Sequence, residues 1–260
     1  MSVRLFVPEP LHSGTEFSLP PGPTRHAQVR RVQPGDVLQL FDGSGCDWPA
    51  TVLAVGRHEV RVQLGSAQPV QRELPRAVTL ALAMPANERM DALVEKATEL
   101  GVAGVQPLMS QRSVLRLAGE RAQRKQQHWQ AIAEAACEQC GRARVPAVAP
   151  VQELLAWLAD LPAAGGQARL LLSLQADARP LAALMASTDV PGDASGDGPG
   201  QTPVLTLSGP EGGLTPEEEA AARKAGFQPV ALGPRVLRAD TAPLAVLAWL
   251  GLAQPFEALD

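Results

Sequence analysis

Two segments rich in glycine and proline follow apolar stretches of the chain, and their residue types suit a flat ligand. The first, Leu207–Thr215, reads LSGPEGGLT, and its three glycines allow the backbone to approach a ligand closely. Its spacing matches neither the dinucleotide fingerprint nor the phosphate-binding P-loop. Ligands of open α/β sheets bind beyond the carboxyl ends of the strands, where this segment is expected to lie. A tight strand-to-helix turn without any ligand would explain the same residues.

The helix expected after this segment limits the charge of a ligand. Thr215 is a natural N-cap, Pro216 suits the first helical position, and Glu218 completes a capping box. Glu217, Glu218 and Glu219 also place negative charge at the positive end of the helix dipole. We therefore expect a phosphate to be repelled here, and a neutral or cationic ligand to be accepted.

The second segment, Leu232–Ala242, reads LGPRVLRADTA and places two arginines and an aspartate in a turn. Arg235, Arg238 and Asp240 must be either solvated or used on a substrate. An exposed loop with an Asp–Thr cap is the alternative. A third candidate loop, Gln175–Asp177, follows the apolar run RLLLSL.

The cysteines and histidines indicate no metal or nucleophilic centre. Cys137 and Cys140 form a single CxxC, and without a second pair nearby they cannot supply the four ligands of a zinc site. They end a predicted long helix, whereas a redox CxxC is expected in a turn between a strand and a helix. The four histidines are scattered, and no Ser-His-Asp arrangement can be read from the spacing. We predict that the protein uses no metal.

The elements that must position these segments fall into two groups. Short strands at 37–41, 50–55 and 60–64 predict a small barrel or sandwich over residues 1–72. From 76 to 260, strands and helices alternate, which predicts a parallel α/β sheet. The expected strands are 78–84, 102–108, 169–174, 204–207 and 228–232; the expected helices are 87–100, 117–140, 151–158, 216–225 and 241–252. Residues 188–203 are mostly Gly, Pro, Asp and Ser, which predicts a disordered insertion.

Composition and charge narrow the function. The chain has 260 residues, a net charge of −4, three cysteines and no run of 18 apolar residues, so we expect a cytoplasmic protein without a membrane segment. With no Tyr, five Phe and four Trp, it is poorly suited to stack many bases. The acidity is uneven: residues 76–150 carry ten basic against seven acidic side chains, and 151–260 carry six against thirteen. Arg116, Arg121, Arg124 and Lys125 on the 117–140 helix suit a solvated face, with RNA backbone contact as the alternative.

Five strings in this order resemble a known family: RHAQVRRVQPGDVLQLFDGSG (25–45), EKATELGV (95–102), EQCGR (138–142), LSGPEGGLT and LGPRVLRADTA. They are similar to the RsmE-type ribosomal RNA uracil-N3 methyltransferases of the SPOUT superfamily. The resemblance spans nearly the whole chain. The chain departs from the family pattern at Asp240, where Glu is usual, at Gln111, where an acidic residue is frequent, and at Cys140, where Ser is common.

The resemblance implies an α/β fold with a C-terminal SPOUT-type parallel sheet containing a deep trefoil knot, preceded by a small PUA-like β-barrel domain that binds RNA. It implies S-adenosyl-L-methionine as cofactor, a homodimer joined through the knot domain, and one uridine of 16S ribosomal RNA in the small subunit as target. The sulfonium of that cofactor agrees with the acidic helix start described above. Methylation of a ribose 2′-oxygen, or RNA binding without catalysis, are the alternative functions.

The resemblance also assigns roles to residues. The implied cofactor-binding residues are Leu174, Gln175, Leu207, Ser208, Gly209, Pro210, Glu211, Gly212, Gly213, Leu232, Gly233, Val236, Leu237, Thr241 and Ala242. The expected catalytic residues are Arg235, Arg238 and Asp240; an arginine would stabilise the developing uracil anion. Either Asp240 or solvent could take the N3 proton. The expected RNA-binding residues are Arg4, Arg25, His26, Arg30, Arg31, Arg112 and Arg142.

Overall fold

The computed structural model describes residues 3–188 and 202–252, so the predicted insertion lies almost wholly outside the described residues. The chain forms two compact units. The first comprises Met1–Glu73 together with Ala133–Val145, and the second comprises Leu74–Ile132 and Pro146–Asp260.

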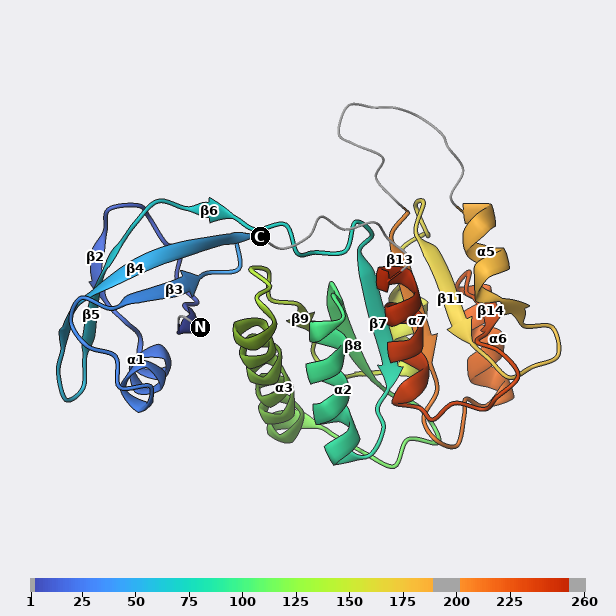
Figure 1. The fold of residues 1–260 in the computed structure, drawn as a ribbon. Coiled ribbons are helices and arrows are strands. Elements are labelled where there is room, and N and C mark those ends of the chain that lie inside the picture. Colours follow the sequence, from blue (N-terminus) through green and yellow to red (C-terminus); the bar gives the residue numbers. More distant parts are fainter. Residues whose placement is uncertain (1–2, 189–201, 253–260) are drawn as a thin grey trace. The chain divides into compact units, whose positions relative to one another are not determined.

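The first unit is built on a six-stranded sheet with one helix (Figure 1). The strand order is β1-β3-β4-β5-β2, and β6 pairs with β4. The β1–β3 pair is parallel and the other pairs are antiparallel. The elements are β1 (Arg4–Phe6), β2 (Glu16–Ser18), α1 (Pro21–Val29), β3 (Val37–Phe41), β4 (Cys46–Val55), β5 (Val60–Leu64) and β6 (Gln68–Pro69). The small β-rich domain predicted from the sequence is confirmed.

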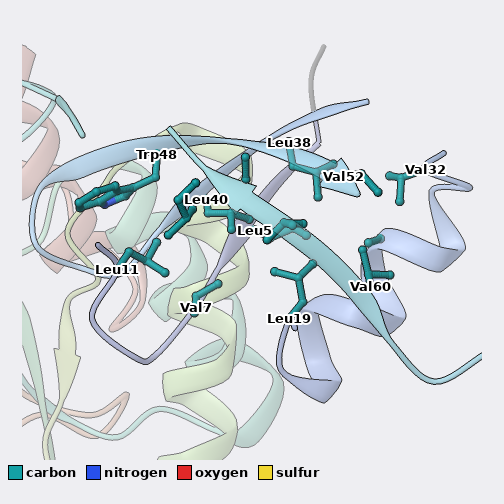
Figure 2. Close-up of a cluster of buried hydrophobic side chains, with 14 residues drawn as sticks. Leu5, Val7, Leu11, Leu19, Val32, Leu38, Leu40, Trp48, Val52 and Val60 are labelled. Atoms are coloured by element: carbon teal, nitrogen blue, oxygen red, sulfur yellow. The ribbon is translucent and has the colours of Figure 1, made fainter. Parts of the chain in front are cut away.

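Alternating apolar side chains build the core of this unit. In β5, for example, Val60, Val62 and Leu64 are buried while the residues between them are exposed, as expected for a strand with one solvated face. Figure 2 shows the buried cluster, in which Leu38 and Leu40 of β3 lie near Leu5 of β1.

Helix α1 was not expected from the sequence. Pro21, Gly22 and Pro23 suggest a turn, yet proline is compatible with the first turn of a helix because no intrahelical bond is needed there. The buried hydroxyl of Thr24 donates to the carbonyl of Leu19 at 2.8 Å, which ties the start of α1 to the preceding chain.

The second unit is an eight-stranded parallel sheet with helices. The strand order is β10-β8-β7-β13-β11-β14-β12, with β9 paired to β8. The elements are β7 (Val78–Ala83), α2 (Asn87–Glu99), β8 (Gly104–Met109), α3 (Gly119–Cys140, whose last turns belong to the first unit), β9 (Ala147–Val148), β10 (Gln152–Glu153), α4 (Leu154–Asp160), β11 (Ala168–Leu172), β12 (Arg179–Pro180), α5 (Leu181–Thr188), β13 (Val204–Ser208), α6 (Pro216–Lys224), β14 (Gln228–Ala231) and α7 (Thr241–Leu252). The predicted parallel α/β sheet is confirmed.

Apolar side chains attach helices to this sheet. Leu205 and Leu207 of β13 pack with Trp157 of α4 and with Ala222 and Phe227, in and just after α6. Helices α2 and α7 lie against one another, and α7 also contacts β13. Within residues 3–188 and 202–252, no helix is both long and apolar enough to cross a membrane.

Candidate functional site

Three neighbouring strands of the second unit bring the predicted loops together. Strand β11 lies between β13 and β14, and all three run parallel. Their carboxyl ends therefore meet at one edge of the sheet, where the loops after Leu172, Ser208 and Ala231 line a pocket of about 910 Å³. We call this the loop pocket. Its size lies within the range of small-molecule and cofactor sites.

Most of the predicted cofactor-binding and catalytic residues line the loop pocket. They are Leu174, Gln175, Ser208, Gly209, Pro210, Glu211, Gly213, Leu232, Gly233, Arg235, Val236, Leu237, Arg238 and Ala242. The predicted residues that do not line it are Leu207, Gly212, Asp240 and Thr241. Leu207 is fully buried within the sheet.

The glycines of the loop after β13 are required by geometry. A Cβ at Gly209 would lie 3.0 Å from the backbone nitrogen of Leu214, so the loop backbone would have to shift by a few tenths of an ångström to accept it. Gly213 has a φ of +69°, which L-residues rarely adopt, and its N–H donates to the carbonyl of Pro210 at 2.8 Å. The loop is therefore folded tightly on itself, with its backbone facing the pocket.

Helix α6 begins with the predicted capping box. The Glu218 N–H donates to the Thr215 hydroxyl at 3.2 Å, and the Thr215 N–H donates to the Glu218 carboxylate at 2.8 Å. The other carboxylate oxygen of Glu218 accepts from the Gln111 N–H at 2.7 Å. Glu218 is only 3% exposed. It therefore joins the end of the glycine-rich loop to the turn that follows β8.

Arg112, in that same turn, holds the loop from the other side. Its guanidinium donates to the carbonyls of Gly212 at 2.9 Å and Leu214 at 3.3 Å. A Cβ at Gly212 would meet the Arg112 side chain at 3.4 Å. The turn itself is fixed by the Ser113 hydroxyl, which accepts from the Ser110 N–H at 3.0 Å. Arg112 was predicted to bind RNA; in the structure its guanidinium is bonded to the loop.

Two exposed ion pairs border the pocket loops. Arg89 of α2 and Glu211 lie 2.8 Å apart, and both line the loop pocket. Arg223 of α6 bonds both carboxylate oxygens of Asp177 at 2.7 and 3.0 Å, and the hydrogen bond from Arg223 lowers the pKa of Asp177. The Arg223–Asp177 pair tethers the loop after β11 to α6.

The three predicted catalytic residues occupy different positions. Arg235 and Arg238 are exposed and line the pocket, and no acidic partner faces either guanidinium in the described ranges. The Asp240 carboxylate lies 3.5 Å from the Thr241 hydroxyl at the start of α7. Asp240 thus lies at a helix start, outside the pocket lining.

Arg89 was missed by the sequence analysis. It lies in the first turn of α2, just after strand β7, and β7 is the direct neighbour of β13. The rule that ligands bind beyond the carboxyl ends of strands applies to β7 as well as to the strands considered. That rule would have identified Arg89 had the strand order been known.

In the first unit, the predicted RNA-binding residues fall into two groups. Arg4 is bonded to Asp47 at 2.6 Å and lies over the ring of Phe41, and Arg142 is 3% exposed and paired with Glu73. These two guanidiniums are occupied within the protein. Arg25, Arg30 and Arg31 are exposed on and just after α1, and His26 Nδ1 lies 3.2 Å from the Glu138 carboxylate.

The CxxC pair lies within the first unit. A hydrogen bond from the Cys137 thiol lowers the pKa of Cys140 to about 6, and the same bond together with burial raises the pKa of Cys137. All three cysteines are free. No cluster of three or more His, Cys, Asp or Glu side chains in the described parts of the chain could hold a metal ion.

The comparisons with known proteins agree with this geometry. Residues 72–251 match the model of an RNA methyltransferase domain, and residues 24–65 match that of an RNA methyltransferase PUA domain. The chain therefore belongs to the RNA methyltransferase family whose catalytic domain is accompanied by a PUA domain.

Proteins that are similar to this chain bear the name of one particular ribosomal RNA methyltransferase. The ribosomal RNA small subunit methyltransferase E of Synechocystis sp. is 35% identical over 85% of this chain and 67% of its own length. The protein of that name from Mycobacterium tuberculosis is 32% identical over 87% of this chain and 82% of its own.

Solved structures extend the match to nearly the whole chain. The enzyme of that name from Neisseria gonorrhoeae, bound to S-adenosyl methionine, has a TM-score of 0.83 at 35% identity and covers 96% of this chain and 97% of its own. A methyltransferase from Legionella pneumophila in complex with the same cofactor has a TM-score of 0.84 at 31% identity, covering 97% and 98%.

Proposed function

We propose that this protein methylates N3 of a specific uridine in the 16S ribosomal RNA of the small subunit, using S-adenosylmethionine. The observation that carries the proposal is the loop pocket, in which three loops predicted from the sequence meet at the carboxyl ends of adjacent parallel strands. The ribosomal target places the protein in the cytoplasm.

The residues of the loop pocket suit this cofactor. Leu174 and Val236 are 75% and 78% exposed in the pocket lining, and a bound adenine would cover apolar surface that is otherwise in water. Gly209 and Gly213 line the pocket without side chains, so a ligand would meet the loop backbone directly. Glu219 lines the same pocket and would attract a cationic sulfonium, whereas the charge of Glu211 is paired with Arg89. We assign the cofactor to the residues that line this pocket.

When bound, S-adenosylmethionine supplies a methyl group on a positively charged sulfur. The protein would contribute by positioning the uracil for in-line transfer of that methyl group, and positioning of this kind provides much of the rate. Arg235 and Arg238 lack acidic partners in the described ranges, so their charges are available to stabilise the uracil as its N3 proton leaves. Asp240 lies beside the pocket-lining residues Arg238 and Ala239, and either Asp240 or solvent would take the proton.

The first unit supplies a second contact with RNA. The exposed side chains of Arg25, Arg30 and Arg31 lie close in sequence at α1 and form the basic surface expected of a domain that binds phosphates. His26 borders this group. Because Arg4 and Arg142 are paired inside the unit, we leave them out of the proposed RNA surface.

We propose that the protein acts as a homodimer joined through the second unit. Helix α7 has no charged residue and is apolar around its whole circumference, whereas a surface helix normally has a polar face. Trp249 is nevertheless 42% exposed, and Leu244, Ala245 and Ala248 are partly exposed. A second copy of the chain would bury this surface.

Primer extension tests the proposed reaction. A methyl group at N3 blocks base pairing, so reverse transcriptase should stop at one uridine of the small-subunit RNA from cells that contain the protein. The stop should disappear when the gene is deleted and return when it is restored. An unchanged pattern after deletion would contradict the proposal, and a change confined to a ribose would favour 2′-O methylation.

A further inference from the structure

A second, smaller pocket of the methyltransferase unit lies beside the loop pocket. It has a volume of about 280 Å³ and is lined by Ala86, Val114, Leu115, Arg116 and Arg121. We call it the arginine pocket. The chain segments 86–89 and 112–116 contribute to both pockets, because Arg89 and Arg112 line the loop pocket. The two pockets are therefore neighbours on one surface of this unit.

The arginine pocket opens onto a basic stretch of helix α3. Residues 111–125 contain five basic side chains and one acidic side chain, Glu120. Arg124 and Lys125 lie three and four positions after Arg121, so each is a neighbour of Arg121 on the helix surface. Arg124 and Glu120 are 3.9 Å apart with side chains that are 73% and 86% exposed, so the pair is weak.

The other basic side chains at this surface bond a backbone carbonyl or have no acidic partner within the described residues. Arg116 donates to the carbonyl of Gln111 at 2.7 Å, which holds it beside the turn that follows β8. Within the described part of the chain, neither Arg121 nor Lys125 has an acidic partner. Val114, at the edge of the pocket, is 79% exposed and offers an apolar contact between the charged groups.

We propose that the arginine pocket and the basic face of α3 bind the phosphate backbone of the RNA substrate next to the target nucleotide. The inference rests on the proposed function and extends it to a second RNA surface. Phosphates would be repelled at the start of α6, which carries Glu217, Glu218 and Glu219, whereas Glu211 is paired with Arg89. The strand therefore approaches over Arg116 and Arg121, where cations are unpaired or bonded only to a carbonyl.

Charge removal on α3 tests this surface in the full-length protein. The double substitution Arg121→Ala and Arg124→Ala should weaken binding of a fluorescein-labelled transcript of small-subunit ribosomal RNA by roughly tenfold at 0.1 M salt. The slope of log affinity against log salt should fall by about 1.5, since each lost phosphate contact lowers it by about 0.7 to 0.9. Fluorescence anisotropy measures both quantities.

Lys224→Ala is the matched control, because Lys224 is an exposed cation of the same unit on α6, away from α3 (Figure 1). It should leave RNA affinity and salt slope unchanged. Calorimetry of S-adenosylmethionine binding should give wild-type affinity for all variants, which also confirms that they are folded. Unchanged RNA affinity and slope in the double variant would overturn the proposal. Failure of the proposed function is a different result, namely absence of uridine methylation by the wild-type protein.

Discussion

Arg238 and Arg112 both line the loop pocket, but they are engaged differently. The Arg238 side chain is exposed and makes no ion pair within the described ranges, whereas Arg112 donates to two carbonyl oxygens of the glycine-rich loop. An unpaired cation can act on a substrate, while a cation bonded to the backbone fixes a loop. The two arginines should therefore give distinct kinetic phenotypes when they are replaced.

Replacement of Arg238 should slow methyl transfer much more than it weakens cofactor binding. We expect Arg238→Ala to lower kcat by about 100-fold, which corresponds to about 2.7 kcal/mol of transition-state stabilisation. The Kd for S-adenosylmethionine should stay within about twofold of the wild-type value. Arg238 is expected to act on the uracil in the transition state and to contribute little to binding of the cofactor in the ground state. Single-turnover kinetics and calorimetry measure the two quantities. An equal loss of cofactor affinity would contradict this role.

Replacement of Arg112 should have the opposite pattern. Arg112→Ala removes the bonds to Gly212 and Leu214, so the loop loses its fixed shape and S-adenosylmethionine should bind several-fold more weakly. Arg112→Lys should restore part of the affinity, because an ammonium can reach one carbonyl but lacks the planar fork. RNA affinity measured without cofactor should not change. A selective loss of RNA affinity would instead support the RNA contact predicted from the sequence.

The thiol of Cys140 should react at unusually low pH. Its pKa of about 6 means that the reactive thiolate predominates above pH 6 and is lost as the pH falls below it. The rate of alkylation by iodoacetamide, followed by mass spectrometry, should reach half its maximum near pH 6. Cys137→Ala removes the hydrogen-bond donor and should move the midpoint toward the ordinary thiol value of about 8.5. A wild-type midpoint near that value would refute the effect.

At the scale of elements, the start of α6 connects the loop pocket to the sheet. Glu218 accepts hydrogen bonds from Thr215 and Gln111, although it is nearly fully buried. We expect Glu218→Ala to lower the free energy of unfolding by about 1 to 3 kcal/mol, because it removes a cap and leaves a buried N–H without a partner. Urea denaturation measures the change. Glu217→Ala, at an exposed position, should cost less than about 1 kcal/mol, and equal costs would argue against the cap.

The sequence predicted the elements well wherever the periodicity was long enough. Strands β3 and β5 and helix α7 have the predicted bounds. The two-residue strands β6, β9, β10 and β12 are too short for any period to be visible. The meeting of the three loops could not be derived from spacing, because it depends on β11 lying between β13 and β14. The trefoil knot implied by the resemblance stays a prediction.

In the whole molecule, the apolar helix α7 is the surface expected to join two copies of the chain in a homodimer. Trp249→Glu places a charge on the proposed dimer surface and should convert the protein to monomers in sedimentation experiments at micromolar concentration. Leu155→Glu is a matched control on α4, because Leu155 is also 42% exposed. The Leu155→Glu variant should remain dimeric. A monomeric wild-type protein, or dissociation of both variants alike, would count against α7 as the interface.

Net charge is a poor guide to the RNA surface of this molecule. The chain is acidic overall, yet the exposed arginines at α1 and the basic face of α3 concentrate positive charge locally. The scarcity of aromatic residues agrees with contacts to phosphates and shape in place of base stacking. We therefore expect a structured ribosomal RNA to be a better substrate than a free single strand.

Identification of the methylated nucleoside is the decisive test of uridine N3 methylation by this protein. The protein would be incubated with methyl-labelled S-adenosylmethionine and small ribosomal subunits from cells that lack it, and the RNA would then be digested and separated by mass spectrometry. We predict labelled 3-methyluridine from a single position of the 16S RNA, formed about 100-fold more slowly by Arg238→Ala. Label in a 2′-O-methyl nucleoside, or no transfer by a folded protein that binds the cofactor, would contradict the account.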